Sequence, residues 1–426
     1  MVRALLIFGV TLLAASISYA QNSTPTDQTE QVRLLLERIQ QLERRVTDLE
    51  AKQAPTSATA VSTAAKESPV SLQSSQQQTP PAATQPHEHE VREQVATVQQ
   101  MEQHYPSLQI RGFGDVDFAA TDQKGTNSNS GFNLGQLDLH LASALSRKVT
   151  YFGEMTFNAQ TTGYTVEVER NIIRYDYNDY FKISFGRYHT PIGYWNTAFH
   201  HGAWLQTTIS RPDIVRIGGT FIPVHFVGFL AEGNIPSGGA GLGYNVGVGN
   251  GRGDTISRPG DLRDNNNNRA WVANIYSRPR GLYGLQMGAS VYRDKINLMG
   301  RDFREWITSA HLVWTKETPE FLAEFANVNH RQVLTDISTN SQAFYVQVGY
   351  RLPWFERTVK PYYRFEYTHT PLSEQVFTNQ DLVGSIVGVR YDISNYAAFK
   401  AEYRNSKREI SNPRVNGLFL QTAFTF

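Results

Sequence analysis

The 426-residue chain contains no cysteine. Its fold therefore cannot depend on disulfide bonds, and it offers no thiolate ligand for a metal. Long apolar runs are also scarce, because only the first residues hold one, ALLIFGVTLLAA. Each membrane-spanning helix needs about 20 consecutive apolar residues. These absences exclude a membrane protein built from a bundle of helices.

An excess of either charge is missing too. The chain has 40 Lys and Arg residues against 39 Asp and Glu residues, for a net charge of +1. Without a basic excess, no nucleic-acid partner is expected. The mean hydropathy of −0.41 describes a polar chain. It is nevertheless compatible with a membrane β-barrel, whose strands are apolar on one face only.

Residues 1–20 have the features of a secretory signal peptide. Arg3 supplies the positive charge at the start, the apolar run follows, and Ser18-Tyr19-Ala20 resembles a cleavage site with small residues. The alternative is an N-terminal membrane anchor. The apolar run is short for an anchor and a polar tract follows it directly, so we predict export and cleavage after Ala20.

Residues 21–52 contain a heptad pattern that predicts a coiled-coil stalk. The a positions are Val32, Ile39 and Val46, and the d positions are Leu35, Leu42 and Leu49. β-branched residues at a with Leu at d favour a dimer, whereas Leu36 at an e position widens the apolar stripe and permits a trimer. The alternative is a single amphipathic helix. We predict a homo-oligomer with this stalk in the periplasm.

Residues 53–106 form a region rich in Ala, Ser, Thr, Gln and Pro. Such a composition cannot bury a core and predicts a flexible linker. A short helix is expected from Glu90 to Gln103, before Pro106. His87 and His89 lie in this linker, and we interpret them as solvated side chains rather than metal ligands.

From residue 107 to residue 426 the apolar residues recur at every second position, as in β-strands. In VKPYYRFEYT, for example, Tyr363 and Phe365 alternate with Arg364 and Glu366. About sixteen such segments follow one another, and their connections mostly alternate between short turns and long polar loops. This pattern predicts an all-β fold, a transmembrane antiparallel up-and-down β-barrel of about 16 strands. A soluble β-sandwich is the alternative, but its strands are shorter.

The chain ends in the alternating strand GLFLQTAFTF. Its apolar face extends to the last residue, so the strand must be buried or paired. In a lipid bilayer every backbone N–H and C=O group must be paired, which requires the last strand to close the barrel against the first. We expect Phe424 and Phe426 to act as the assembly signal for the barrel-assembly machinery of the outer membrane.

Taken together, the signal peptide, heptad stalk, polar linker, roughly sixteen strands and terminal Phe resemble the phosphate-selective porin O/P-like group of outer-membrane porins. The segment GRYHTPIG resembles that group's entry into its third loop. The resemblance implies a trimer in the outer membrane of a Gram-negative-type bacterium. It does not extend to the group's cluster of pore lysines, because only eight of the 32 basic residues after position 106 are lysine. Phosphate selectivity is therefore not expected.

The longest connection, residues 190–219, contains many apolar side chains and is expected to fold into the lumen and narrow it. Alternation also places several basic side chains on the inner face of the barrel. The predicted pore-lining or constricting residues are Arg187, Trp195, His200, His201, Trp204, Arg211, Arg216, Arg351, Lys360, Arg364, Arg390, Lys400 and Arg404. The alternative role for each charge is a structural salt bridge along the wall.

The barrel segment holds 32 basic and 28 acidic residues, which predicts a weak anion preference. No cofactor is expected. His200 and His201 could suggest a metal site, but adjacent residues of a strand point in opposite directions, so no metal site is predicted. The sequence thus predicts a passive diffusion porin and no enzyme. The alternatives are a barrel lipase or protease that uses His200 or His201 with Ser210, and an adhesin tethered to the cell wall.

Overall fold

The computed structural model describes residues 105–426, except residues 125–129, 200, 217, 379–380 and 410–411. The predicted signal peptide (1–20), the coiled-coil stalk with its heptad positions from Val32 to Leu49, and nearly all of the linker (53–106) lie outside the described residues. These remain predictions. Among the residues described, no helix is both long enough and apolar enough to cross a membrane.

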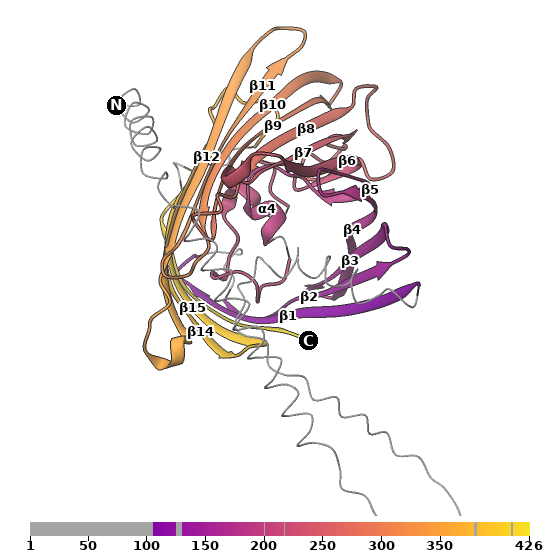
Figure 1. Ribbon diagram of the computed structural model, residues 1–426. Coiled ribbons are helices and arrows are strands. Elements are labelled where there is room, and N and C mark those ends of the chain that lie inside the picture. The colour runs from indigo at the N-terminus through magenta and orange to yellow at the C-terminus, as the bar shows by residue number, and fades with distance from the viewer. Residues whose placement is uncertain (1–104, 125–129, 200, 217, 379–380, 410–411) are drawn as a thin grey trace, which may run out of the picture. The chain divides into compact units, whose positions relative to one another are not determined.

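Sixteen antiparallel strands form one closed barrel, as the alternation predicts (Figure 1). They are β1 (Ser107–Thr121), β2 (Gly131–Ala144), β3 (Val149–Gln160), β4 (Gly163–Asn178), β5 (Phe181–His189), β6 (His225–Ile235), β7 (Leu242–Asn250), β8 (Ala270–Ser277), β9 (Leu285–Leu298), β10 (Arg301–Trp314), β11 (Glu320–Gln332), β12 (Ser338–Gly349), β13 (Val359–His369), β14 (Leu382–Ser394), β15 (Ala397–Arg408) and β16 (Val415–Thr425). Each strand pairs with its neighbours in the sequence, and β1 pairs with β16.

The barrel buries its polar face and exposes its apolar face. In β13 the Lys360 and Arg364 side chains face the interior and are 1% and 0% exposed, whereas Tyr363 between them is 40% exposed. Many other large apolar residues on the strands are exposed as well, such as Leu134 and Val387. A water-soluble protein would show the opposite arrangement, because burial of apolar surface drives its folding. The outer surface is therefore suited to an apolar solvent.

The last strand closes the ring. β16 pairs antiparallel with β1 from Phe113 opposite Thr425 to Thr121 opposite Gly417. Beyond this ladder, the Phe426 N–H donates to the Gly112 carbonyl at 2.9 Å, and the Gly112 N–H donates to the Phe426 carbonyl at 2.8 Å. The terminal residue is thus tied into the sheet, which explains why the apolar alternation continues to the end of the chain.

The connections at one end of the barrel are turns, such as residues 179–180 and 395–396. At the other end they include the longest loops, residues 190–224, 251–269 and 370–381. Two connections at this second end are only two residues long, 161–162 and 299–300, so the alternation of short and long connections is not strict.

The interior of the barrel is not empty. The connection between β5 and β6, residues 190–224, folds inside the ring and is called the inner loop below (Figure 1). It contains the short helix α4 (Trp195–Ala198) and the 3₁₀ turn η2 (Asp213–Val215). Two further 3₁₀ turns, η3 (Gly238–Ala240) and η4 (Phe355–Arg357), lie in other connections.

Candidate functional site: the constriction of the barrel lumen

Apolar side chains attach the inner loop to the wall of the barrel. Ile192 and Trp195 are 1% and 0% exposed, although they lie on a connecting loop. The Trp195 ring packs edge to face against Tyr345 of β12, with 5.9 Å between the ring centroids. Trp195 also contacts Phe199, at 4.8 Å between centroids. Burying such side chains stabilises the inward position by about 1.5–3 kcal/mol each, before the entropy of ordering the loop is subtracted.

Glu324 of β11 holds the start of α4. Its carboxylate accepts hydrogen bonds from the backbone N–H groups of Tyr194 at 2.7 Å and Trp195 at 2.8 Å. The carboxylate can reach them because Gly193 precedes them with φ of +73°, and a Cβ atom there would lie 2.0 Å from Glu324 Oε2. A glycine is therefore needed at position 193 for both its backbone angle and its missing side chain.

Three basic side chains of the wall donate to backbone carbonyls of the inner loop. Arg364 of β13 donates to the Ser210 carbonyl at 2.7 Å. Arg390 of β14 donates to the carbonyls of Trp204 at 2.7 Å and Gln206 at 2.9 Å. Lys400 of β15 donates to the Ala203 carbonyl at 2.5 Å and the Thr208 carbonyl at 3.1 Å. These charge-assisted bonds satisfy loop carbonyls that would otherwise need water. The partners are Ala203, Trp204, Gln206, Thr208 and Ser210.

Acidic side chains of the wall complete the attachment. Glu402 of β15 accepts from the Ile209 N–H at 2.6 Å, and Glu366 of β13 accepts from the Asp213 N–H at 2.7 Å. Glu320 of β11 accepts from the Thr207 hydroxyl at 2.9 Å. The wall therefore forms hydrogen bonds both with donor groups of the inner loop and with its carbonyl acceptors. The wall residues in these contacts are Glu320, Glu366 and Glu402.

The wall cations also pair with wall carboxylates. Lys360 contacts Glu320 at 2.5 Å, Arg364 contacts Glu366 at 2.8 Å and Arg390 contacts Asp392 at 2.8 Å. The side chains of these cations face the interior, where the alternation places them, but they lie beneath the inner loop. Their charge is compensated within a few ångströms. Their effect on a passing solute stays a prediction.

Other predicted site residues lie around this region. Arg351 contacts Glu317 at 2.6 Å and Asp392 at 2.5 Å near the turns, and Arg404 contacts Glu402 at 2.7 Å. Arg187, at the foot of the inner loop, contacts Asp261 at 3.0 Å.

Within the inner loop itself, the Trp204 ring lies 5.9 Å from the guanidinium of Arg390. Arg211 donates to the Val215 carbonyl at 3.0 Å, and burial lowers the pKa of Arg211 to about 10. Arg216 pairs with Asp213 at 3.1 Å, while 45% of its side chain remains exposed. His200 lies outside the described residues.

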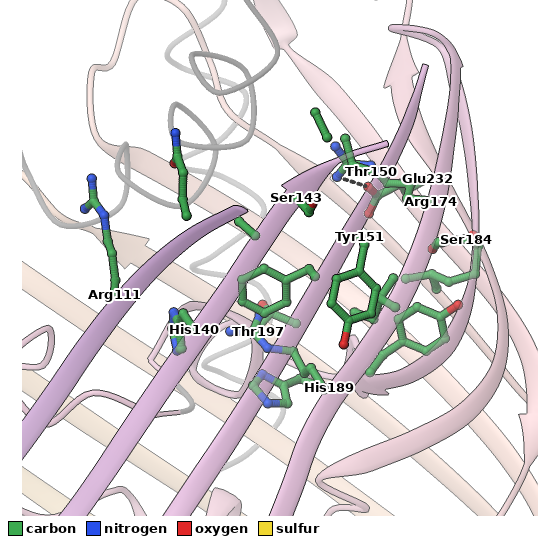
Figure 2. A pocket seen from close by; sticks show the side chains of 18 residues that line it. Arg111, His140, Ser143, Thr150, Tyr151, Arg174, Ser184, His189, Thr197 and Glu232 are labelled. Atoms are coloured by element: carbon green, nitrogen blue, oxygen red, sulfur yellow. Dashed lines mark hydrogen bonds and ion pairs between the residues drawn. The ribbon is translucent and has the colours of Figure 1, made fainter. Parts of the chain in front are cut away.

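A cavity of about 210 Å³ remains between α4 and strands β1 to β6. Figure 2 shows Arg111 of β1, His140 of β2 and His189 of β5 around the cavity, with Thr197 of α4 close by. Arg174 and Glu232 lie elsewhere on its lining and are joined at 3.6 Å. The lining combines apolar side chains with three arginines and one carboxylate, namely Arg111, Arg170, Arg174 and Glu232.

A buried group of titratable side chains borders this cavity. Glu154 of β3 contacts Arg170 at 2.6 Å and His140 at 2.9 Å. Glu169 of β4 contacts His225 of β6 at 2.5 Å. His201, which was among the predicted site residues, belongs to this group because it lies 3.5 Å from Glu169.

Sequence alternation did not single out Glu169, and it could not place Glu169 and Arg170 on the same face, because a β-bulge interrupts the regular strand between them. The register between β3 and β4 shifts where Glu154 is opposite Arg170 and Met155 is opposite Val168. Glu169 is the extra residue of the bulge. Both Glu169 and Arg170 therefore point inward, although adjacent residues of a regular strand point to opposite faces.

His201 and Ser210, a pair considered for catalysis, both belong to the inner loop but contact different strands of the wall. The Ser210 hydroxyl accepts a hydrogen bond from Arg364 at 2.6 Å. His201 instead faces β2, where its Nδ1 atom lies 3.3 Å from the Gln136 side-chain oxygen. This arrangement does not place the imidazole where it could activate the hydroxyl.

Comparisons with known proteins support the fold. The sequence matches no protein-family model and no curated protein. The structure is similar to that of the anion-selective porin from Comamonas acidovorans, at 9% identity and a TM-score of 0.57, over 75% of this chain and 100% of that one. It is similar to the outer membrane channel DcaP of Acinetobacter baumannii, at 13% identity and a TM-score of 0.53, over 75% and 97% of the two chains. It is also similar to the trimer form of OmpT of Vibrio cholerae, at 13% identity and a TM-score of 0.51, over 76% and 100%. The chain therefore shares the fold of these proteins, while the closer resemblance to the phosphate-selective group stays a prediction.

Proposed function

We propose that this protein is an outer-membrane porin that lets small hydrophilic solutes and ions diffuse passively through its lumen. The proposal rests on one observation: the barrel is closed, and its side chains are apolar on the outside and polar on the inside. In a bilayer such a ring leaves no unpaired strand edge. The structural likeness to a porin and an outer membrane channel agrees with this assignment.

The inner loop is the proposed constriction. It crosses the lumen and is held by wall residues from β11, β13, β14 and β15, such as Glu324 and Lys400. Solutes would pass beside it, along the cavity lined by Arg111, Arg174 and Glu232. Because most wall cations are paired with carboxylates or loop carbonyls, only a weak anion preference is proposed, from the small basic excess of the barrel segment.

The protein is further proposed to be a homotrimer in the outer membrane of a Gram-negative-type bacterium, with its N-terminal stalk in the periplasm. The heptads of residues 31–50 support an oligomer. One of the similar structures is a trimer form. Cross-linking of the purified protein in detergent would give a three-chain product.

Conductance in planar lipid bilayers tests the function. The mature protein should produce discrete, ohmic steps, and a salt gradient should give a reversal potential slightly on the anion side. The variant Arg174→Glu should shift that potential towards cations, and Arg280→Glu, at an exposed position of a turn outside the cavity lining, serves as a control. A properly folded protein without conductance would contradict the proposal, especially if it cleaved lipid or peptide.

A further inference from the structure

A group of three side chains joins the inner loop to two strands of the wall. Glu154 comes from β3, His189 from the end of β5 and His201 from the inner loop. One oxygen or nitrogen atom of each lies within 4.8 Å of those of the other two, and all three residues are buried. These residues are called the histidine cluster below.

We propose that the histidine cluster binds a transition-metal ion such as Zn²⁺, which fastens the inner loop to the wall. Two imidazole nitrogens and one carboxylate oxygen are a ligand set that Zn²⁺ commonly takes, with a fourth position left open. This site is independent of the diffusion function proposed above.

The spacing of the ligand atoms is close to that of a tetrahedral site. With metal–ligand bonds of about 2.0–2.1 Å, two ligand atoms of a tetrahedron lie about 3.3 Å apart. His189 Nε2 and Glu154 Oε2 lie 3.5 Å apart, near this value. The other spacings are at most 4.8 Å and close by a side-chain movement of about 1 Å or less for each ligand.

The orientation of His201 is that of a metal ligand. Its Nδ1 atom faces the Gln136 side-chain oxygen at 3.3 Å and an Asp138 oxygen at 3.6 Å. Metal-binding histidines usually donate one ring N–H to a carboxylate or carbonyl, which fixes the other nitrogen toward the metal. The other nitrogen, Nε2, lies 3.5 Å from Glu169, and we assign it as the metal ligand. Glu169 or water is placed to take the fourth position.

Glu154 is held in position as well. His140 contacts Glu154 Oε1 at 2.9 Å, which leaves Oε2 directed toward His189 and Arg170. Arg170 contacts Oε2 at 2.6 Å and must turn aside when a metal binds. It has room to do so, because it lines the cavity of about 210 Å³. The same cavity is lined by His189 (Figure 2).

The charges around the site favour transition metals over Ca²⁺ and Mg²⁺. Three carboxylates, Asp138, Glu154 and Glu169, are accompanied by Arg170, by Arg187 at 4.0 Å from Glu169, and by Arg211. The near-neutral surroundings offer little attraction for a hard cation that needs many oxygen ligands. The imidazoles instead supply the affinity, and they suit Zn²⁺, Co²⁺ and Ni²⁺.

Cobalt spectroscopy of the full chain in detergent tests the proposal. After treatment with a chelator, the protein should bind one Co²⁺ per chain with the strong visible absorption of a tetrahedral site. Zn²⁺ should abolish this absorption and Ca²⁺ should not. His189→Gln and His201→Gln should each lose it, whereas the control His369→Gln, whose side chain is 48% exposed and pairs with Asp381, should keep it.

The proposal would be overturned if the wild-type protein showed no Co²⁺ absorption, or only the weak absorption of an octahedral Co²⁺ ion. Full tetrahedral absorption in His189→Gln would overturn it as well. Heat-dependent migration in electrophoresis shows whether each variant has folded. If the histidine variants fail to fold, the proposal is tested on the wild-type protein alone. Its Co²⁺ stoichiometry and the displacement of Co²⁺ by Zn²⁺ but not by Ca²⁺ are then the decisive measurements. Conductance of the metal-free protein tests the porin separately, so the two proposals can fail independently.

Discussion

At the scale of single residues, the barrel interior contains charges that are buried in pairs. Arg364 is 0% exposed and uses its whole guanidinium group: it contacts Glu366 at 2.8 Å, the Thr208 hydroxyl at 2.9 Å and the Ser210 hydroxyl at 2.6 Å. Removing one partner of such a network leaves the other charge buried without compensation. A residue predicted to act on solutes is thus also one that positions the inner loop.

Arg364→Met should therefore loosen the inner loop. The change leaves the Glu366 carboxylate buried without its charged partner and removes the hydrogen bond to the Ser210 carbonyl. We therefore expect the free energy of unfolding to fall by about 3 kcal/mol. In bilayers the variant should show larger and noisier conductance steps. Arg364→Lys keeps the charge but not the forked geometry, so it should have an intermediate effect.

Thermal unfolding in detergent and single-channel recording measure the two effects. Arg331→Met is a suitable control, because Arg331 pairs with Asp336 near the end of β11 with 47% of its side chain exposed. Unchanged conductance and stability in Arg364→Met would mean that Arg364 does not hold the loop.

At the scale of elements, a second loop packs against the inner loop. Phe377 of loop 370–381 lies 5.9 Å from the Phe221 ring of the inner loop and 4.6 Å from the His330 ring. Glu374 fixes this second loop by contacts with His330 at 2.9 Å and the Thr339 hydroxyl at 2.6 Å. The inner loop is thereby supported from two sides, by the wall and by its neighbouring loop.

The support from Glu374 should be lost in acid. Burial acts to raise the pKa of Glu374, but hydrogen bonding with His330 and Thr339 outweighs it and lowers the pKa to about 2. A carboxylate with a depressed pKa stabilises the folded state fully above its unfolded value of about 4.3, and this contribution disappears as the pH falls through the folded value. We expect channel noise to stay constant from neutral pH to about pH 4 and to rise between about pH 4 and 2.

Recordings across this pH range test the expectation in the wild type and in Glu374→Gln. The variant should already be noisy at neutral pH, because an amide cannot replace the charged partner of His330. Glu356→Gln, at an exposed position of a turn, should behave like the wild type. A noise profile in Glu374→Gln that matches the wild type at every pH would contradict the role of this loop.

How far the sequence predicts these elements depends on the range of the interactions. Period-two alternation is local, so it identified the strands and placed Lys360 and Arg364 on the inner face. It could not locate the bulge at Glu169, because a single inserted residue reverses the alternation without a local signal. Nor could it reveal that the inner loop covers the wall cations, which requires contacts between residues about 150 or more positions apart, such as Lys400 with Ala203.

At the scale of the whole molecule, closure of the barrel depends on its last residue. Phe426 exchanges two backbone hydrogen bonds with Gly112, and its ring covers the position where a Cβ of residue 112 would lie, 2.2 Å from Phe426 Cζ. The pairing of β1 with β16 is the strand contact most distant in the sequence, so forming it carries a larger loop-closure entropy than pairing within any hairpin. This pairing of β1 with β16 is called the seam below. Weakening the seam should therefore affect assembly more than it affects the stability of hairpins that have already formed.

Deleting Phe426 should lower the yield of folded barrel in the outer membrane severalfold, because the deletion removes both hydrogen bonds at the end of the seam and the ring that packs there. Gly112→Ala should have a weaker effect of the same kind, since the new methyl group displaces the ring but leaves the backbone bonds. Thr425→Ala is the control, because it keeps Phe426 and removes only a side-chain bond to the Gly112 carbonyl. Heat-dependent electrophoretic migration of membrane fractions measures the folded share. Equal yields for the deletion and the control would mean that the seam closes without its terminal residue, and closure would then rest on the ladder from Phe113 to Thr121 alone.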